Sequence, residues 1–187
     1  NTRIIDNISY RSPYAVDNSD TPWFPPIGNQ ASQGSCTAWA VGYYIKTYQE
    51  AKEHSWNLTG ATWAAGQPTV NYQSHIMSPA FIYNLINDGV DLGSSFQKAI
   101  QLVCNIGISS WQKTPYDPVD DTTWPSEGAW AEAPLYRGNS SYGYQYLYAN
   151  SIEGIQRLKN WLAAGNLAVI AVDAEQYDNL TTADVWT

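Results

Sequence analysis

The sequence predicts an α+β fold, with several helices and one short β-strand near the end of the chain. Apolar residues recur at helical spacing in separate segments, each preceded by a residue suited to begin a helix. The run from Leu167 to Val172 is continuously apolar and contains Val and Ile, which is typical of a strand. Because 44% of the 187 residues are apolar, the chain can bury a core.

The first half of the chain is expected to pass from an extended segment into a long helix. Residues 1–35 are predicted to be extended, because prolines interrupt them repeatedly. A helix is expected to begin at Cys36 and continue to about Lys52, and residues 54–76 are expected to form a long, loop-like insertion. The apolar face of this helix comprises Ala40, Val41, Tyr44, Ile45 and Tyr48.

Two further helices are predicted in the middle of the chain. Ser78 followed by proline is the signature of a helix N-cap and first turn, and the helix should break before Gly89. The next helix is expected to start after Ser94 or Ser95 and to end at Gly107.

The last third is expected to be irregular before a final helix and strand. Residues 109–149 contain several prolines and show no periodicity. Ser151 is expected to cap a helix that Gly165 ends, and the strand at 167–172 follows it.

Composition limits the possible partners and the location of the protein. Nine basic and seventeen acidic residues give a net charge of −8 without a Lys/Arg cluster, so we expect no nucleic acid partner. The acidity could favour cationic substrates, although diffuse negative charge more often serves solubility. No apolar run is long enough to predict a membrane span. A surface of neutral polar residues favours an extracellular or cell-surface location.

Cys36 is a candidate nucleophile because of its position at the start of a helix. The residues Gln33, Gly34 and Ser35 form a tight turn that leaves the sulfur uncovered, and the free N–H groups of a helix N-terminus stabilise a thiolate. The amide of Gln30 could donate to an oxyanion at the same place. The alternative is that Cys36 is a small buried hydrophobic residue, as a free cysteine often is.

The run around Cys36 resembles the nucleophile motif of the papain family of cysteine peptidases. In that motif an Asn-Gln-Gly-Ser-x-Gly-Ser-Cys sequence opens a long central helix, and residues 25–40 read PPIGNQASQGSCTAWA. The resemblance implies that Cys36 is the nucleophile, Gln30 the oxyanion-hole side chain, and Gly34 a backbone wall of the S1 subsite. It implies no cofactor and no metal.

The resemblance extends over roughly residues 16–174. Gly93 lies where the family's substrate-lining glycine pair begins, and Ser94 replaces the second glycine; Phe96 and Ala171 are further expected substrate-binding residues. Two departures lie beside the nucleophile: Gln33 stands where many members have a disulfide cysteine, and Thr37 replaces a tryptophan. Gly107-Ile108 leading to Pro115-Tyr116 is similar to a conserved corner of the family, and Cys104, on an apolar helix face, is expected to be packed inside.

The implied fold is the papain-like two-lobe fold over residues 1–187. A helical lobe would cover about 30–150, with insertions at 54–76 and 117–150. Residues 1–29 and 151–187 would contribute to the start of a β-barrel lobe.

The family's catalytic histidine and asparagine follow the strand that 167–172 resembles. We therefore expect a C-terminal fragment or continuation to supply them, with a nick near 175–187 as one route. His54 and His75 are expected to be ordinary loop histidines. The acidic loop Asp117, Asp120 and Asp121 lacks the spacing of a Ca²⁺ loop and is expected to be solvated.

The predicted function is thiol-dependent endopeptidase activity on a peptide or protein substrate, through an acyl-enzyme at Cys36. One alternative is a non-catalytic papain-like binding or adhesion module, which the aromatic-rich insertions would suit. Another is a thiol acyltransferase of the transglutaminase type. A His and an Asn following Thr187 would favour the peptidase over the binding module.

Overall fold

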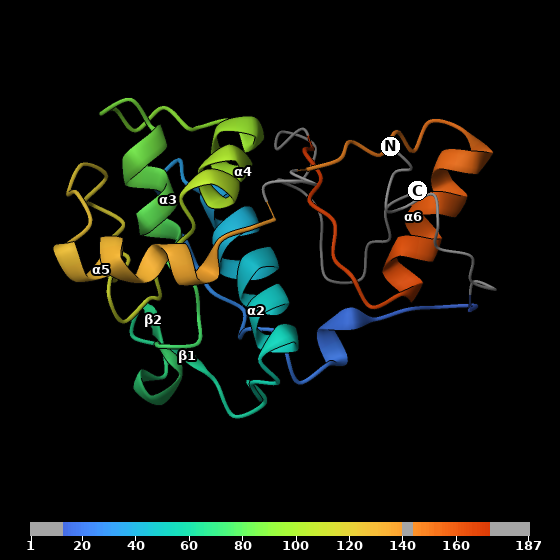
Figure 1. Ribbon diagram of the computed structural model, residues 1–187, viewed down its shortest axis with the longest axis horizontal. Coiled ribbons are helices and arrows are strands. Elements are labelled where there is room, and N and C mark those ends of the chain that lie inside the picture. Colours follow the sequence, from blue (N-terminus) through green and yellow to red (C-terminus); the bar gives the residue numbers. More distant parts are fainter. Residues whose placement is uncertain (1–12, 140–143, 173–187) are drawn as a thin grey trace.

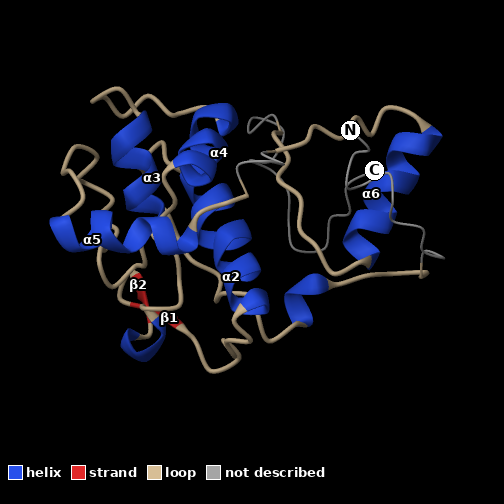
Figure 2. Ribbon diagram, in the orientation of Figure 1, coloured by secondary structure: helices blue, strands red, loops and turns tan. Residues whose placement is uncertain are grey.

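The computed structural model describes residues 13–139 and 144–172. One group of helices packs together with a small hairpin at its edge, and the last helix stands apart from this group (Figure 1). Helices dominate the described part of the chain (Figure 2). In chain order the elements are the 3-10 helix η2 Asn18–Asp20, α1 Cys36–Ala38, the π-helix η3 Trp39–Lys46, α2 Thr47–Glu53, β1 Trp63–Ala64, β2 Gln67–Pro68, the 3-10 helix η4 Val70–Tyr72, α3 Pro79–Ile86, α4 Phe96–Asn105, α5 Glu127–Glu132, the 3-10 helix η5 Ala133–Tyr136 and α6 Ile152–Ala163.

The predicted helix that begins at Cys36 is confirmed as one continuous helix made of α1, η3 and α2. Its middle part is a π-helix, which is wider than an α-helix. Gly42 lies in this part, where a Cβ atom would come 2.8 Å from Ile82 Cδ1 and 3.0 Å from Ile108 Cδ1. Glycine therefore allows α3 to pack closely against the central helix.

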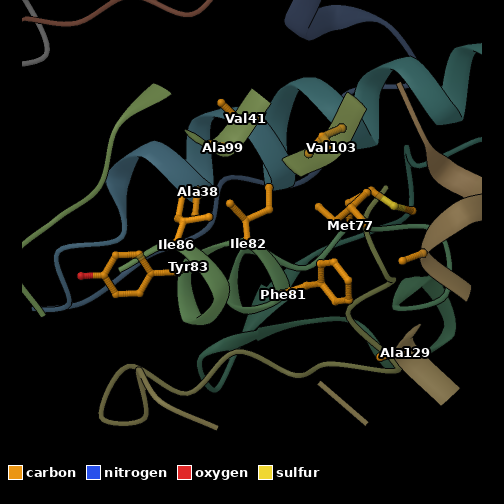
Figure 3. Packing of buried hydrophobic residues seen from close by; sticks show 12 residues of the cluster. Ala38, Val41, Met77, Phe81, Ile82, Tyr83, Ile86, Ala99, Val103 and Ala129 are labelled. Carbon is orange, nitrogen blue, oxygen red and sulfur yellow. The ribbon is translucent and has the colours of Figure 1, made fainter. Parts of the chain in front are cut away.

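The core packs the central helix against α3 and α4 (Figure 3). Ala38 and Val41 face Ile82, Ala99 and Val103 across this interface, and all of them are buried. The Tyr83 ring lies at the edge of the cluster, with its hydroxyl pointing away from the apolar residues (Figure 3). Burial of these side chains is the main favourable term that holds the three helices together.

A second cluster is mainly aromatic. Trp39, Tyr43, Trp111 and Tyr116 are buried in it, and Trp63 covers them. Ring centroids of Trp39 lie 5.1 Å from Tyr116 and 5.6 Å from Trp63, both in edge-to-face arrangements that suit aromatic pairs. This cluster fixes the start of the central helix against the middle of the chain.

The insertion at 54–76 contains a β-hairpin, so the expectation that it is loop-like is wrong in part. Trp63 pairs with Pro68 and Ala64 with Gln67. The two residues between the strands, Ala65 and Gly66, have φ values of 51° and 77°, as a tight hairpin turn requires. The sequence did not predict this turn, because alanine is rare at positive φ.

The expectation that 109–149 is irregular is also wrong in part. Helix α5 begins after Ser126, whose side chain accepts a hydrogen bond from the Ala129 N–H, and η5 continues it. Gly107 packs directly on this helix: a Cβ there would lie 1.8 Å from the Ala133 oxygen. With only six residues, α5 is too short to show an apolar period.

The helices at 78–88, 95–106 and 151–165 are confirmed as α3, α4 and α6. Ser78, Ser95 and Ser151 each cap the following helix with a side-chain hydrogen bond. Within residues 13–139 and 144–172, no helix combines the length and apolar character that a membrane crossing needs.

The predicted strand Leu167–Val172 is wrong for the described structure. These residues are extended without strand pairing, and Ile170 and Val172 are 66% and 45% exposed. Only Val169 packs against the first core cluster. The sheet formed by the described residues contains β1 and β2 alone. An apolar run becomes a strand only beside a partner, and the β-barrel lobe therefore stays a prediction.

Candidate functional site

The Cys36 thiol is exposed at the first residue of the central helix, whereas the Cys104 thiol is buried on α4. Thr37 and Ala38, the next two residues, are buried and fix the helix so that Cys36 faces solvent. The alternative that Cys36 is a small buried hydrophobic residue is therefore wrong. The expectation that Cys104 is packed inside is confirmed. Burial raises the pKa of the Cys104 thiol, and nearby Lys46 partly opposes this effect.

The backbone before Cys36, residues 29–35, is called the Cys36 loop. Tyr116 holds both of its ends: the Tyr116 hydroxyl donates to the Gln30 carbonyl over 2.8 Å and lies 2.7 Å from Ser35 Oγ. Because the phenol has one proton, Ser35 Oγ is the donor in the second contact. Burial raises the pKa of Tyr116, which keeps this proton in place at neutral pH.

Gln30 folds back over the Cys36 loop. Its side-chain nitrogen donates to the Gln33 carbonyl over 3.0 Å. Within the loop, Asn29 Oδ1 accepts from the Ala31 N–H over 2.7 Å, and Ala31 has a φ of 55°. An amide nitrogen carries two protons, so the second N–H of Gln30 can still serve an oxyanion.

Gln33 ties the Cys36 loop to the acidic loop 117–121. The side chain is 2% exposed, and its nitrogen lies 3.3 Å from the Asp117 carbonyl and 3.4 Å from the Asp120 carbonyl. Hydrogen bonds thus hold the residue at which the resemblance described above implies the loss of a disulfide cysteine.

Gly34 and Gly93 lie next to each other, although 59 positions separate them in the sequence. A Cβ at Gly34 would come 3.0 Å from the Gly93 nitrogen and 3.2 Å from the Tyr83 hydroxyl. The Gly34 N–H donates to Asp91 Oδ1 over 2.7 Å, and the Gly93 N–H donates to the Tyr83 hydroxyl over 3.3 Å. The structure therefore brings two of the predicted substrate residues together beside Cys36.

Ser94 also belongs to this group, because its carbonyl accepts from Thr37 Oγ1 over 3.2 Å. The Ser94 hydroxyl is buried and has no hydrogen-bond partner in the described structure. Phe96 begins α4 and packs partly against the core. Ala171 is exposed after α6, and no described contact joins it to the Cys36 loop. The substrate roles of Phe96 and Ala171 stay predictions.

Two residues of the site, Asp91 and Tyr83, were not singled out from the sequence. Burial, and then the hydrogen bond with Asp91, raise the pKa of Tyr83 to about 12, so Tyr83 remains a donor to the carboxylate. In the sequence, Tyr83 lies among the apolar residues of a predicted helix, so nothing marks it as a site residue. No local pattern joins it, or Asp91, to a glycine more than 45 positions earlier.

The two histidines lie at the opposite end of the central helix. His54 stacks on one side of Trp56 with ring centroids 4.9 Å apart, and His75 stacks on the same ring at 4.4 Å. At 1.5 Å per residue, the helix separates His54 from Cys36 by about 25 Å. The sequence contains no other histidine, and the position of these two beside Trp56 leaves Cys36 without a histidine base among residues 1–187.

The acidic loop 117–121 is organised by its own backbone. Asp120 Oδ1 accepts from the N–H groups of Thr122 and Thr123, and hydrogen bonds from Thr123 lower the pKa of Asp120. Among the described residues, no three His, Cys, Asp or Glu side chains are arranged to hold a metal ion.

The fold is similar to that of a cysteine protease. Its structure matches the crystal structure of xylellain, a cysteine protease from Xylella fastidiosa, with a TM-score of 0.54 and 21% sequence identity. The match covers 80% of this chain and 53% of the xylellain chain, so this chain spans about half the length of that protease. No family model and no curated protein matches the sequence.

Proposed function

We propose that this chain carries the nucleophile of a papain-like cysteine peptidase, which hydrolyses peptide bonds through an acyl-enzyme at Cys36. The observation that supports this most strongly is the exposed thiol at the start of a long helix, behind a loop that Tyr116, Gln33 and Asp91 hold in place. Similarity of the fold to a cysteine protease supports it independently.

In the proposed reaction the Cys36 thiolate attacks the substrate carbonyl carbon and forms a thioester after the amine leaves. The N–H of Cys36 and the second N–H of Gln30 donate to the oxyanion of the tetrahedral intermediate. Water then attacks the thioester and releases the acid. Hydrogen bonds from Tyr116 and Gln33 and to Asp91 hold the Cys36 loop in place. The two oxyanion donors therefore need little movement when the tetrahedral intermediate forms.

A base must take the thiol proton and return it to the leaving amine. Because His54 and His75 lie at the far end of the central helix, we propose that a histidine and an asparagine from a segment outside these 187 residues complete the site. An extracellular or cell-surface location is part of the same proposal.

The test is peptide hydrolysis by the full-length protein, with Cys36→Ala and Cys104→Ala as a matched pair. Loss of the nucleophile should lower kcat/KM by more than about 10³-fold, whereas Cys104→Ala should retain activity. In the wild type, iodoacetamide should label Cys36 before Cys104, because the second thiol is buried. Preferential labelling of Cys104, or equal loss of activity in both variants, contradicts the proposal.

A binding module is the second candidate. Tyr144, Tyr146 and Tyr148 form a row of neighbouring rings, and the last two are 59% and 71% exposed. Tyrosine is enriched at binding interfaces, because its ring is apolar and its hydroxyl can donate a hydrogen bond. A full-length protein that hydrolyses no peptide would favour this candidate, and transfer of the acyl group to an added amine would favour an acyltransferase.

A further inference from the structure

The carboxylate of Asp91 lies against the backbone of the Cys36 loop. Its Oδ1 accepts from the Gly34 N–H over 2.7 Å and from the Tyr83 hydroxyl. The same hydroxyl accepts from the Gly93 N–H, so the carboxylate is held at the edge that Gly34 and Gly93 form. Two residues of chain span at most about 7 Å, which places Asp91 close to the Cys36 backbone.

The charge of Asp91 is not neutralised by a cation in the described part of the chain. Lys98, on the following helix, pairs with Asp88 over 2.6 Å, and the remaining ion pairs among described residues involve Glu50. Both hydrogen bonds to Asp91 use Oδ1, and the residue is exposed. Its Oδ2 can therefore accept from a donor that approaches from solvent.

We propose that Asp91 selects a lysine or arginine side chain in the substrate residue whose carbonyl Cys36 attacks. This inference rests on the proposed peptidase function, in which Gly34 forms the backbone wall beside that side chain. A guanidinium or ammonium group at the end of a long flexible side chain can reach a carboxylate on this wall and form a charge-assisted hydrogen bond. A neutral side chain of the same length leaves the Asp91 charge solvated and gains nothing from it.

The electrostatic potential around Asp91 also favours a substrate with a lysine or arginine side chain. Burial is the main cause of the raised pKa of Tyr83 and of Tyr116; the charges of Asp91 and Asp121 add to the shift at Tyr83, and those of Asp91 and Asp117 add to it at Tyr116. Negative charge therefore surrounds the Cys36 loop on more than one side, which attracts a cationic substrate during its approach.

A purely structural role for Asp91 predicts a different result from a role in specificity. In Asp91→Asn the amide oxygen can still accept from the Gly34 N–H and the Tyr83 hydroxyl, but the charge is lost. Asp88→Asn is the matched control, because Asp88 carries the same charge three positions earlier and bonds Lys98 instead of the loop.

The experiment uses the full-length protein and two fluorogenic peptides that differ only at the attacked residue, one with arginine and one with citrulline, its neutral isostere. The wild type should cleave the arginine peptide with about tenfold higher kcat/KM, a preference that 0.5 M NaCl should reduce. The ratio should fall towards one in Asp91→Asn and stay unchanged in Asp88→Asn. Cleavage of both peptides at equal rates, or an unchanged ratio in Asp91→Asn, overturns the role of Asp91 and leaves the peptidase function intact.

A second readout separates failure of this inference from failure of the proposed function. Peptidyl chloromethyl ketones with the same two residues alkylate a thiolate directly: the C–S bond forms while chloride leaves with the C–Cl electron pair. If neither peptide is hydrolysed, the peptidase proposal fails. The rate ratio of Cys36 alkylation, about tenfold in favour of arginine and lost in Asp91→Asn, then still decides whether Asp91 recognises the cation.

Discussion

The two ends of the central helix differ in the kind of chemistry they can support. At the start, an exposed thiol follows the Cys36 loop, and the Asp91 carboxylate bonds the backbone of this loop. At the end, two histidines stack on Trp56, and Glu50 pairs with both His54 and Lys46 in a buried position. The thiol thus lies at one end of the central helix and the imidazoles lie beyond its other end, so the length of the helix keeps them apart. The histidine end is structural, and the Cys36 end is where we expect chemistry.

The largest effect is expected from breaking the buried pair at the histidine end. Glu50 and Lys46 are 3% and 5% exposed, so Glu50→Ala leaves a buried charge without its partner. The free energy of unfolding in urea should fall by about 3–5 kcal/mol. Glu53→Ala, on the exposed side of α2, is the control and should change it by less than about 0.5 kcal/mol. Equal effects of the two variants would show that the pair has no structural role.

The next effect concerns catalysis at the Cys36 end. Gln30→Ala removes the proposed oxyanion donor and should lower kcat about 10²-fold in the full-length protein. KM should change little, because the donor acts mainly in the transition state. Asn29→Ala, in the same turn, removes only a hydrogen bond within the loop and should cost less. A Gln30→Ala variant with normal kcat would exclude this residue from the oxyanion hole.

Tyr116→Phe tests how the Cys36 loop is held. The substitution removes one hydroxyl that contacts both Gln30 and Ser35, while the ring remains in the aromatic cluster. We expect the free energy of unfolding to fall by about 1–3 kcal/mol and turnover to fall with it. Tyr72→Phe, beside the same cluster, is the control for loss of a tyrosine hydroxyl. Unchanged turnover in Tyr116→Phe would mean that the Cys36 loop keeps its geometry without the hydrogen bonds of the Tyr116 hydroxyl.

The smallest effect is a pH dependence at the histidine end. Burial lowers the pKa of His75, so the folded state binds a proton there less readily than the unfolded state. Its stabilising contribution is complete above the unfolded pKa, near 6.5, and decreases as the pH falls through the range below it. His75→Gln should therefore flatten the loss of stability between about pH 7 and pH 5. A steeper loss in this variant would contradict the assigned direction of the shift.

The sequence by itself determined the four main helices, the caps of three of them and the position of Cys36 at a helix start. Ser78, Ser95 and Ser151 cap helices as predicted, and Cys36 begins the central helix with its thiol exposed. These features depend on residues within a few positions of one another, because hydrogen bonds at a helix N-terminus and the helical apolar period are local properties.

Only the tertiary structure decided how the site is assembled and which apolar segments find partners. Asp91 reaches Gly34, and Tyr116 reaches Gln30, across separations that no local pattern encodes. The run 167–172 has the composition of a strand but lacks a neighbouring strand in the described structure. A β-strand depends on hydrogen bonds to another segment, and a binding site depends on contacts between distant ones. Both are therefore decided by packing, which brings distant parts of the chain together.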